Sequence, residues 1–183
     1  MHKIKFFGLG GQGVVTAARI LVHAVSIYED KFGKTVPAYG HERRGAPVFA
    51  DVMIDRRDIL LNSFVYEPDM VVVFAQSVLD HGVPIAKGIH KDTILVMNTG
   101  DEALLEQLKK EHIFKEIYYV DATRVALEQT GREIPNSAIL GALARTGVVG
   151  IDSALSSLKE FFKSHGGKNA AAAQTAYERT KKW

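Results

Sequence analysis

The chain has 183 residues, of which 46% are hydrophobic and 24% are charged, and its formal net charge is +2. This is the composition of an ordinary globular domain with one sizeable core, and so small a net charge gives no reason to expect a nucleic-acid or membrane partner. Cysteine is absent, which excludes disulfides, thiolate-held iron–sulfur clusters and cysteine-based zinc sites on this chain. The longest apolar stretch, 138–151, is interrupted by Arg145 and is too short for a membrane span. The N-terminus has no signal-peptide pattern, so we expect a cytoplasmic protein.

The first motif lies at the N-terminus. An apolar strand over 4–7 leads into the turn GLGGQG at 8–13, and a helix with apolar positions at helical spacing follows. This is the first half of a βαβ unit, with glycines at the G-x-G-x-x-G spacing. The first amides of a helix lack internal partners and carry partial positive charge, so they suit an anion such as phosphate. The motif predicts a phosphate-binding turn, with a tight turn that binds nothing as the alternative.

The connection after the second predicted strand carries two adjacent arginines. A nicotinamide-binding fold needs an acidic residue after that strand to hold the ribose, but the acidic pair 29–30 precedes the strand at 35–36. The segment 37–47 carries Arg43 and Arg44 instead, and arginine forks bind phosphate at two points. In the βαβ interpretation this segment shares a sheet edge with the glycine turn, where open α/β sheets bind ligands. The alternative is a solvated pair of surface charges.

The remainder of the chain alternates strands and helices. Apolar runs at 70–74, 93–97 and 117–120 are typical of buried parallel strands. Residues 48–54 and 59–61, joined by a polar turn, predict a β-hairpin. Further helices are expected over 102–111, 138–146, 154–163 and 169–182. We therefore predict an α/β fold with a Rossmann-like open, mostly parallel sheet and flanking helices, plus a β-hairpin insertion and a C-terminal helical arm.

We assign residues 1–165 to a single Rossmann-like domain and 166–183 to the arm. The helix over 138–146 contains small residues, among them Gly141, which allow close approach of another backbone. The last helix is alanine-rich and polar. We interpret both helices as surfaces that pack on something else.

Candidate polar groups elsewhere give little support for catalysis. Asn98 follows the strand 93–97 and is expected to line the same crevice as the glycine turn, or else to form an ordinary strand-to-helix turn. Asp101 and Glu102 are better explained as capping a helix than as an acid–base pair. There is no G-x-S-x-G elbow, and the seven histidines are scattered, with only His41 near other candidate groups. We predict no catalytic and no metal-binding residue.

Two segments together resemble a known family. Residues 8–18, GLGGQGVVTAA, and 39–48, YGHERRGAPV, are similar to the gamma subunit of the 2-oxoacid:ferredoxin oxidoreductases, in the form of its pyruvate and branched-chain members. Residues 66–69, YEPD, and the pair Asn136-Ser137 before the small-residue helix also resemble that family. The resemblance covers nearly the whole chain.

The resemblance implies one part of a larger enzyme. The family oxidatively decarboxylates a 2-oxoacid with thiamine diphosphate, passes electrons through iron–sulfur clusters to ferredoxin, and releases acyl-coenzyme A. This chain has no cysteine and no G-D-G…N segment for thiamine diphosphate and magnesium, so these cofactors are expected on partner subunits of alpha, beta and delta type. Its implied role is assembly and coenzyme A binding, with the 3′-phosphate matching the arginine pair and the diphosphate matching the glycine turn. The implied binding residues are Gly8, Gly10, Gly11, Gln12, Gly13, Arg43, Arg44 and Asn98.

Two other functions stay open at this point. A free-standing nucleotide-binding dehydrogenase would bind NAD(H) by itself, and the missing ribose acid disfavours it. A purely structural subunit, whose glycine turn only packs against partners, would bind no nucleotide but would still co-purify with larger chains.

Overall fold

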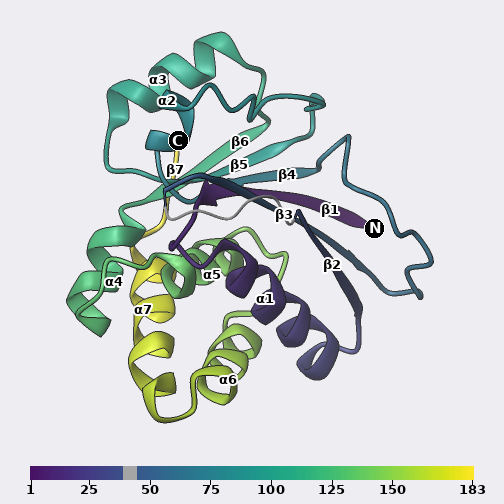
Figure 1. Ribbon diagram of the computed structural model, residues 1–183, viewed down its shortest axis with the longest axis vertical. Coiled ribbons are helices and arrows are strands. Elements are labelled where there is room, and N and C mark those ends of the chain that lie inside the picture. The colour runs from purple at the N-terminus through teal and green to yellow at the C-terminus, as the bar shows by residue number, and fades with distance from the viewer. Residues whose placement is uncertain (39–44) are drawn as a thin grey trace.

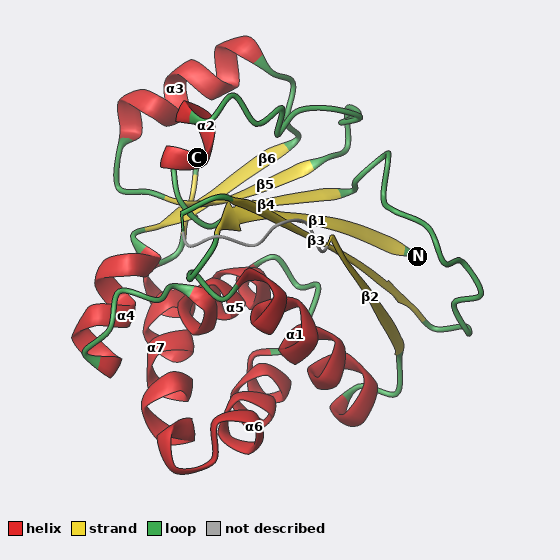
Figure 2. Ribbon diagram, in the orientation of Figure 1, coloured by secondary structure: helices red, strands yellow, loops and turns green. Residues whose placement is uncertain are grey.

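A mixed β-sheet runs through residues 1–38 and 45–183, the part of the chain that the structure, a computed structural model, describes (Figures 1 and 2). Within these residues the sheet has seven strands in the order β2-β3-β1-β4-β5-β6-β7. Their bounds are β1 (His2–Leu9), β2 (Phe32–Ala38), β3 (Pro47–Asp55), β4 (Met70–Val73), β5 (Ile94–Asn98), β6 (Glu116–Val120) and β7 (Lys181–Lys182). Strands β1, β4, β5 and β6 are parallel, whereas β3 is antiparallel to β1 and β2, and β7 is antiparallel to β6. The predicted α/β fold with a mostly parallel centre is confirmed.

Helices cover both faces of this sheet unequally, as Figure 1 shows. One face carries α1 (Val14–Tyr28), α5 (Asn136–Arg145), α6 (Ile151–Phe162) and α7 (Gly166–Arg179), with α4 (Ala122–Thr130) beside α7 and the short 3₁₀ turn η1 (Lys163–His165) before it. The other face carries α2 (Ser77–Asp80) and α3 (Glu102–Glu111) near β4, β5 and β6. The thicker helical layer therefore stands on the side of the glycine turn.

Two hydrophobic cores separate these layers. In β1, Ile4 and Phe6 enter the larger core beneath α1 and α5, while Phe7 enters the smaller core beneath α3. Strand β4 alternates in the same way, with Val72 in the larger core and Val71 in the smaller one. Because successive side chains of a strand point to opposite faces, a strand between two cores must be apolar throughout. This explains the continuous apolar runs in the sequence.

The predicted β-hairpin between 48–54 and 59–61 does not form, so this prediction is wrong. We expected 48–54 to pair with 59–61, but β3 pairs with β2 on one side and β1 on the other. Residues 59–61 lie in no strand, and Ile59 is buried in a small cluster with Val65. The carboxylate of Asp51 accepts a hydrogen bond from Val65 N (2.7 Å) and so holds this segment against the sheet. Although β3 separates β1 from β2, these two strands run in the same direction and end at one edge.

The C-terminal helix is part of the helical layer, and the expectation of an extended arm is wrong. The alanine face of α7 is buried, through Ala170, Ala172, Ala173 and Ala176. A Cβ on Gly141 of α5 would clash with the carbonyl oxygen of Ala173, so the two helices approach more closely than any larger residue would permit. The close approach predicted for the small-residue helix thus occurs, and its partner is α7 of the same chain. Strand β7 then adds to β6 at the sheet edge.

Candidate functional site

The glycine turn connects β1 to α1 through two residues with left-handed backbone. Gly11 has φ +99° and Gly13 has φ +75°, conformations that side chains disfavour. The turn is closed by Gln12, whose backbone N donates to Leu9 O (3.1 Å) and whose Oε1 accepts from Leu9 N (2.8 Å). A Cβ on Gly8 would clash with the side chain of Val14, so the strand and the helix are closely packed here. Gln12, a predicted ligand contact, therefore uses its side-chain oxygen to hold the turn.

The start of α1 leaves backbone donors facing a pocket. The first helical hydrogen bond runs from Ala17 N to Gly13 O (2.8 Å), so the preceding amides of Val14, Val15 and Thr16 have no intrahelical partner. These three residues line a pocket of about 500 Å³, which we call the glycine-turn pocket. Its other lining residues are Leu9, Gly10, Gly11, Gly13, Val48, Ile134, Asn136 and Phe162. Helix amides of this kind attract anions.

The connection after β2 returns to the glycine turn. Gly10 N donates to Ala46 O (2.8 Å), and Gly45 N donates to Gly10 O (3.1 Å). The prediction that this connection shares an edge with the turn is therefore confirmed by its last residues. The candidates Arg43 and Arg44, like His41, lie outside the described residues.

One buried side chain projects into the pocket from α5. Asn136 is only 6% exposed, and its Oδ1 accepts from Ser137 N (2.8 Å). Its Nδ2 lies toward the turn, because a Cβ on Gly13 would stand 2.6 Å from it. Within the described residues this Nδ2 donates no hydrogen bond, and since it is not among the fully buried unpartnered atoms it opens into the pocket. Nothing in the sequence indicated that Asn136 meets the glycine turn.

Asn98, by contrast, does not reach the glycine-turn pocket. Its Nδ2 donates to Phe74 O (2.7 Å) and to Thr123 Oγ1 (2.8 Å), and its Oδ1 accepts from Ala122 N (2.8 Å) and Thr123 N (3.2 Å). The residue lines a separate pocket of about 230 Å³ at the ends of β5 and β6. All its donors are occupied, so it ties strands and helix together and is not available to a ligand. The prediction that it lines the same crevice is wrong.

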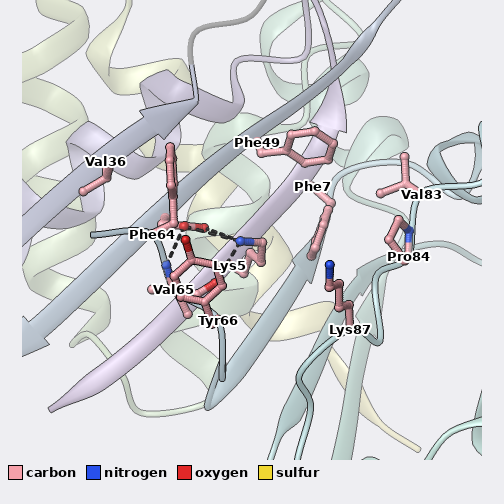
Figure 3. Close-up of a pocket in the computed structure, with 11 residues that line it drawn as sticks. Lys5, Phe7, Val36, Phe49, Phe64, Val65, Tyr66, Val83, Pro84 and Lys87 are labelled. Carbon is pink, nitrogen blue, oxygen red and sulfur yellow. Dashed lines mark hydrogen bonds and ion pairs between the residues drawn. The ribbon is translucent and has the colours of Figure 1, made fainter. Parts of the chain in front are cut away.

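A third pocket lies on the opposite face of the sheet from the glycine-turn pocket, and Figure 3 shows its lining side chains. This aromatic pocket of about 300 Å³ is lined by Lys5, Phe7, Val36, Phe49, Asp51, Phe64, Val65, Tyr66, Val83, Pro84 and Lys87. The rings of Phe7 and Phe49 meet edge to face at 5.5 Å. Beside them the Lys5 ammonium pairs with the buried Asp51 carboxylate (3.2 Å) and donates to Val65 O (2.9 Å).

The described part of the chain contains neither a cluster of metal-binding side chains nor a helix suited to cross a membrane. Nowhere in it do three or more histidine, aspartate or glutamate side chains gather in a way that would hold a metal ion. None of its helices combines the length and hydrophobicity that a membrane crossing requires.

The fold and the glycine-turn pocket define the class: a Rossmann-like domain with a pocket that presents backbone amides and one largely buried side-chain amide. The family model described as pyruvate ferredoxin/flavodoxin oxidoreductase matches residues 3–179. The chain belongs to this family.

Individual relatives agree along their full lengths. The common gamma subunit of the pyruvate/ketoisovalerate oxidoreductases of Pyrococcus furiosus is 46% identical, over 98% of this chain and 97% of its own. Subunit PorC of the pyruvate synthase of Methanothermobacter marburgensis is 43% identical, over 99% of this chain and 98% of its own. The crystal structure of pyruvate oxidoreductase subunit PORC from Thermotoga maritima has a TM-score of 0.82 at 32% identity, covering 99% of this chain and 97% of that one. The resemblance to the gamma subunits is thus confirmed.

A more distant structure shares the fold within a longer chain. The 2-oxoglutarate:ferredoxin oxidoreductase from Magnetococcus marinus has a TM-score of 0.70 at 17% identity, covering 97% of this chain but 30% of that chain. The same architecture therefore occurs both as a separate subunit and as about a third of a larger polypeptide.

Proposed function

We propose that this gamma-type subunit binds the phosphates of coenzyme A within a multi-subunit 2-oxoacid:ferredoxin oxidoreductase. The complex would convert a 2-oxoacid such as pyruvate to acyl-coenzyme A and CO2 while reducing ferredoxin. The observation that carries the proposal is the glycine-turn pocket, where the free amides of α1 and the unpartnered Nδ2 of Asn136 face one space. Gly45 and Ala46, which follow Arg43 and Arg44 in the sequence, exchange backbone hydrogen bonds with Gly10.

The chemistry of the pocket fits an anion that the protein recognises largely through its backbone. The glycines leave room for close approach, and the helix amides supply donors without adding a charge. The arginine pair adds charge that can bind phosphate at two points. The M. marinus enzyme, which contains this fold, was solved with coenzyme A bound. At 17% identity that likeness supports the fold, and the ligand remains our proposal for this chain.

The rest of the reaction is assigned to partner chains. Thiamine diphosphate with its magnesium and the iron–sulfur clusters would sit on subunits of alpha, beta and delta type, and ferredoxin would meet the complex through them. With no cysteine in its sequence, this chain offers no thiolate to such clusters. The purified chain should therefore be colourless and should not reduce a dye when given a 2-oxoacid.

The test is pre-steady-state kinetics of the assembled oxidoreductase with Arg43→Ala and Arg44→Ala. Each charged hydrogen bond lost is worth about 1.5–3 kcal/mol, so each variant should raise the coenzyme A KM about 10- to 100-fold. The half-reaction that precedes coenzyme A, with CO2 release and the first electron transfer, should be unchanged. Normal coenzyme A dependence, or an equal loss of the first half-reaction in an intact complex, would refute the assignment and favour a purely structural subunit.

A further inference from the structure

The glycine-turn pocket continues past Asn136 into a neighbouring pocket. This second space has a volume of about 330 Å³, and the two share Ile134, Asn136 and Phe162 as walls. The other residues lining it are Thr130, Arg132, His165, Lys168 and Asn169. We call the two spaces together the long groove. One end is the glycine turn, and the other lies between the end of α4 and the start of α7.

The far end of the long groove is positively charged. Arg132 follows α4, and Lys168 stands in the first turn of α7, and both side chains are exposed. Among the described residues neither one forms an ion pair. Lys168 also lies at the positive end of a 14-residue helix whose N-cap, His165, makes no side-chain capping bond. Two cations and a helix N-terminus thus meet in one pocket.

Asn136 joins the two ends of the groove. It lines both pockets, it is more than nine-tenths buried, and its Nδ2 has no partner in the described chain. Its side chain is held by one hydrogen bond, which Oδ1 accepts from Ser137 N. Ser137 is itself tied to α7, because its Oγ donates to Asn169 Oδ1 (2.6 Å). Because Asn136 Nδ2 is not among the fully buried unpartnered atoms, it is open to the groove and can donate to a ligand oxygen. The groove is therefore suited to a ligand that passes over Asn136 and is anionic at both ends.

We propose that Arg132 and Lys168 hold the 3′-phosphate of coenzyme A. This rests on the proposed function, and it places the diphosphate at the glycine turn. Coenzyme A carries a diphosphate and a separate phosphomonoester, which matches a groove with two anion-binding ends. The arrangement revises the sequence-based assignment of the 3′-phosphate to the arginine pair. A phosphomonoester gains more from two cations than from backbone amides alone, since bonds to ionised donors are the stronger ones.

The test compares coenzyme A with 3′-dephospho-coenzyme A in the assembled oxidoreductase. The double variant Arg132→Gln/Lys168→Gln should raise the KM for coenzyme A about 10- to 100-fold. The KM for the dephospho compound should not change, because it lacks the group that these residues hold. The matched control Lys109→Gln/Lys110→Gln removes the same charge from α3, across the sheet, and should change neither constant.

Two results would overturn the proposal. An equal rise for both compounds would mean that the far end holds another part of the ligand, and no rise for either would mean that the ligand does not reach it. The variant Gly11→Asp shows whether such a result overturns only the 3′-phosphate site or also the proposed binding of coenzyme A. It should raise the KM for both compounds if the chain binds coenzyme A at all, and an unchanged KM would remove the coenzyme A assignment itself.

Discussion

The glycine-turn pocket and the aromatic pocket both involve β1, and they differ in the chemical groups that line them. The glycine-turn pocket lies at the end of this strand, whereas the aromatic pocket lies on the opposite face of the sheet. The first consists of glycine backbone, helix amides and one buried amide side chain. The second consists of aromatic rings around a buried ion pair. In the first, Nδ2 of Asn136 and the first amides of α1 have no partner in the described chain. In the second, Asp51 is satisfied by Lys5 and Val65.

This difference separates binding from stability. A donor without a protein partner contributes to binding when a ligand accepts its hydrogen bond. A donor that is already paired with an acceptor in the protein stabilises the fold without any ligand. Variants of the glycine-turn pocket should therefore change coenzyme A dependence with little change in unfolding. Variants of the aromatic pocket should do the reverse.

The largest effect is expected from Asp51→Ala. It leaves the Lys5 ammonium without its carboxylate and removes the acceptor that holds Val65, so the free energy of unfolding should fall by about 3 kcal/mol. Chemical denaturation of the isolated chain measures this. Lys5→Met/Asp51→Leu removes the unpaired ammonium as well and should recover the part of the loss due to that charge, while Val65 N still lacks its acceptor. The coenzyme A KM of the assembled enzyme should stay normal, and a rise would end the separation of the two pockets.

The next effect concerns Gly11→Asp in the glycine turn. A carboxylate at this position would repel the bound phosphate, and we expect the coenzyme A KM to rise more than 100-fold, a loss of about 3 kcal/mol. Gly11 has φ +99°, so any side chain strains the turn. Gly11→Ala is the matched control, because it shares the strain without the charge and should have a much smaller effect. If the two variants behave alike, strain rather than anion binding explains the loss.

Asn136→Asp tests the buried donor with an almost unchanged shape. The aspartate retains an oxygen to accept from Ser137 N, but it replaces the NH2 group with a second acceptor. Because the aspartate also places a negative charge at a largely buried position facing the phosphate, we expect the coenzyme A KM to rise about 100-fold and the thermal midpoint to fall by a few degrees. Steady-state kinetics and a thermal melt of the same preparation decide this. A large drop in the midpoint with an unchanged KM would make Asn136 a structural residue.

The smallest effect lies far from both pockets, at Glu29. Burial raises the pKa of this carboxyl, but hydrogen bonds from the Lys31 ammonium and from Gly150 N outweigh it and hold the pKa below its usual 4.5. A lowered folded pKa contributes stability above pH 4.5, and this contribution is lost as pH falls through the folded value. Glu29→Gln should therefore cost about 1 kcal/mol at pH 7 and almost nothing in strong acid. Unfolding curves across pH measure the difference, and a constant cost at every pH would contradict it.

The order of strands and helices was predictable because its signals are local. Continuous apolar runs marked β4 and β5, which are buried on both faces, and helical spacing marked α1. Asp101 caps α3 as expected, with its Oδ1 accepting from Ala103 N (3.0 Å) and Leu104 N (3.2 Å). The glycine turn was also readable, because positive φ at Gly11 and Gly13 requires a residue without a side chain.

The secondary-structure elements and the glycine turn could thus be predicted from the amino-acid sequence, since each depends on residues a few positions apart. Tertiary structure alone decided that β3 lies between β1 and β2, that α7 packs into the helical layer, and that Asn136 meets Gly13 while Asn98 does not. These outcomes depend on pairs such as Gly10 with Ala46 and Ser137 with Asn169, which are distant in the chain. Periodicity and capping describe neighbours along the helix or strand, whereas a pocket depends on which distant surfaces bury one another.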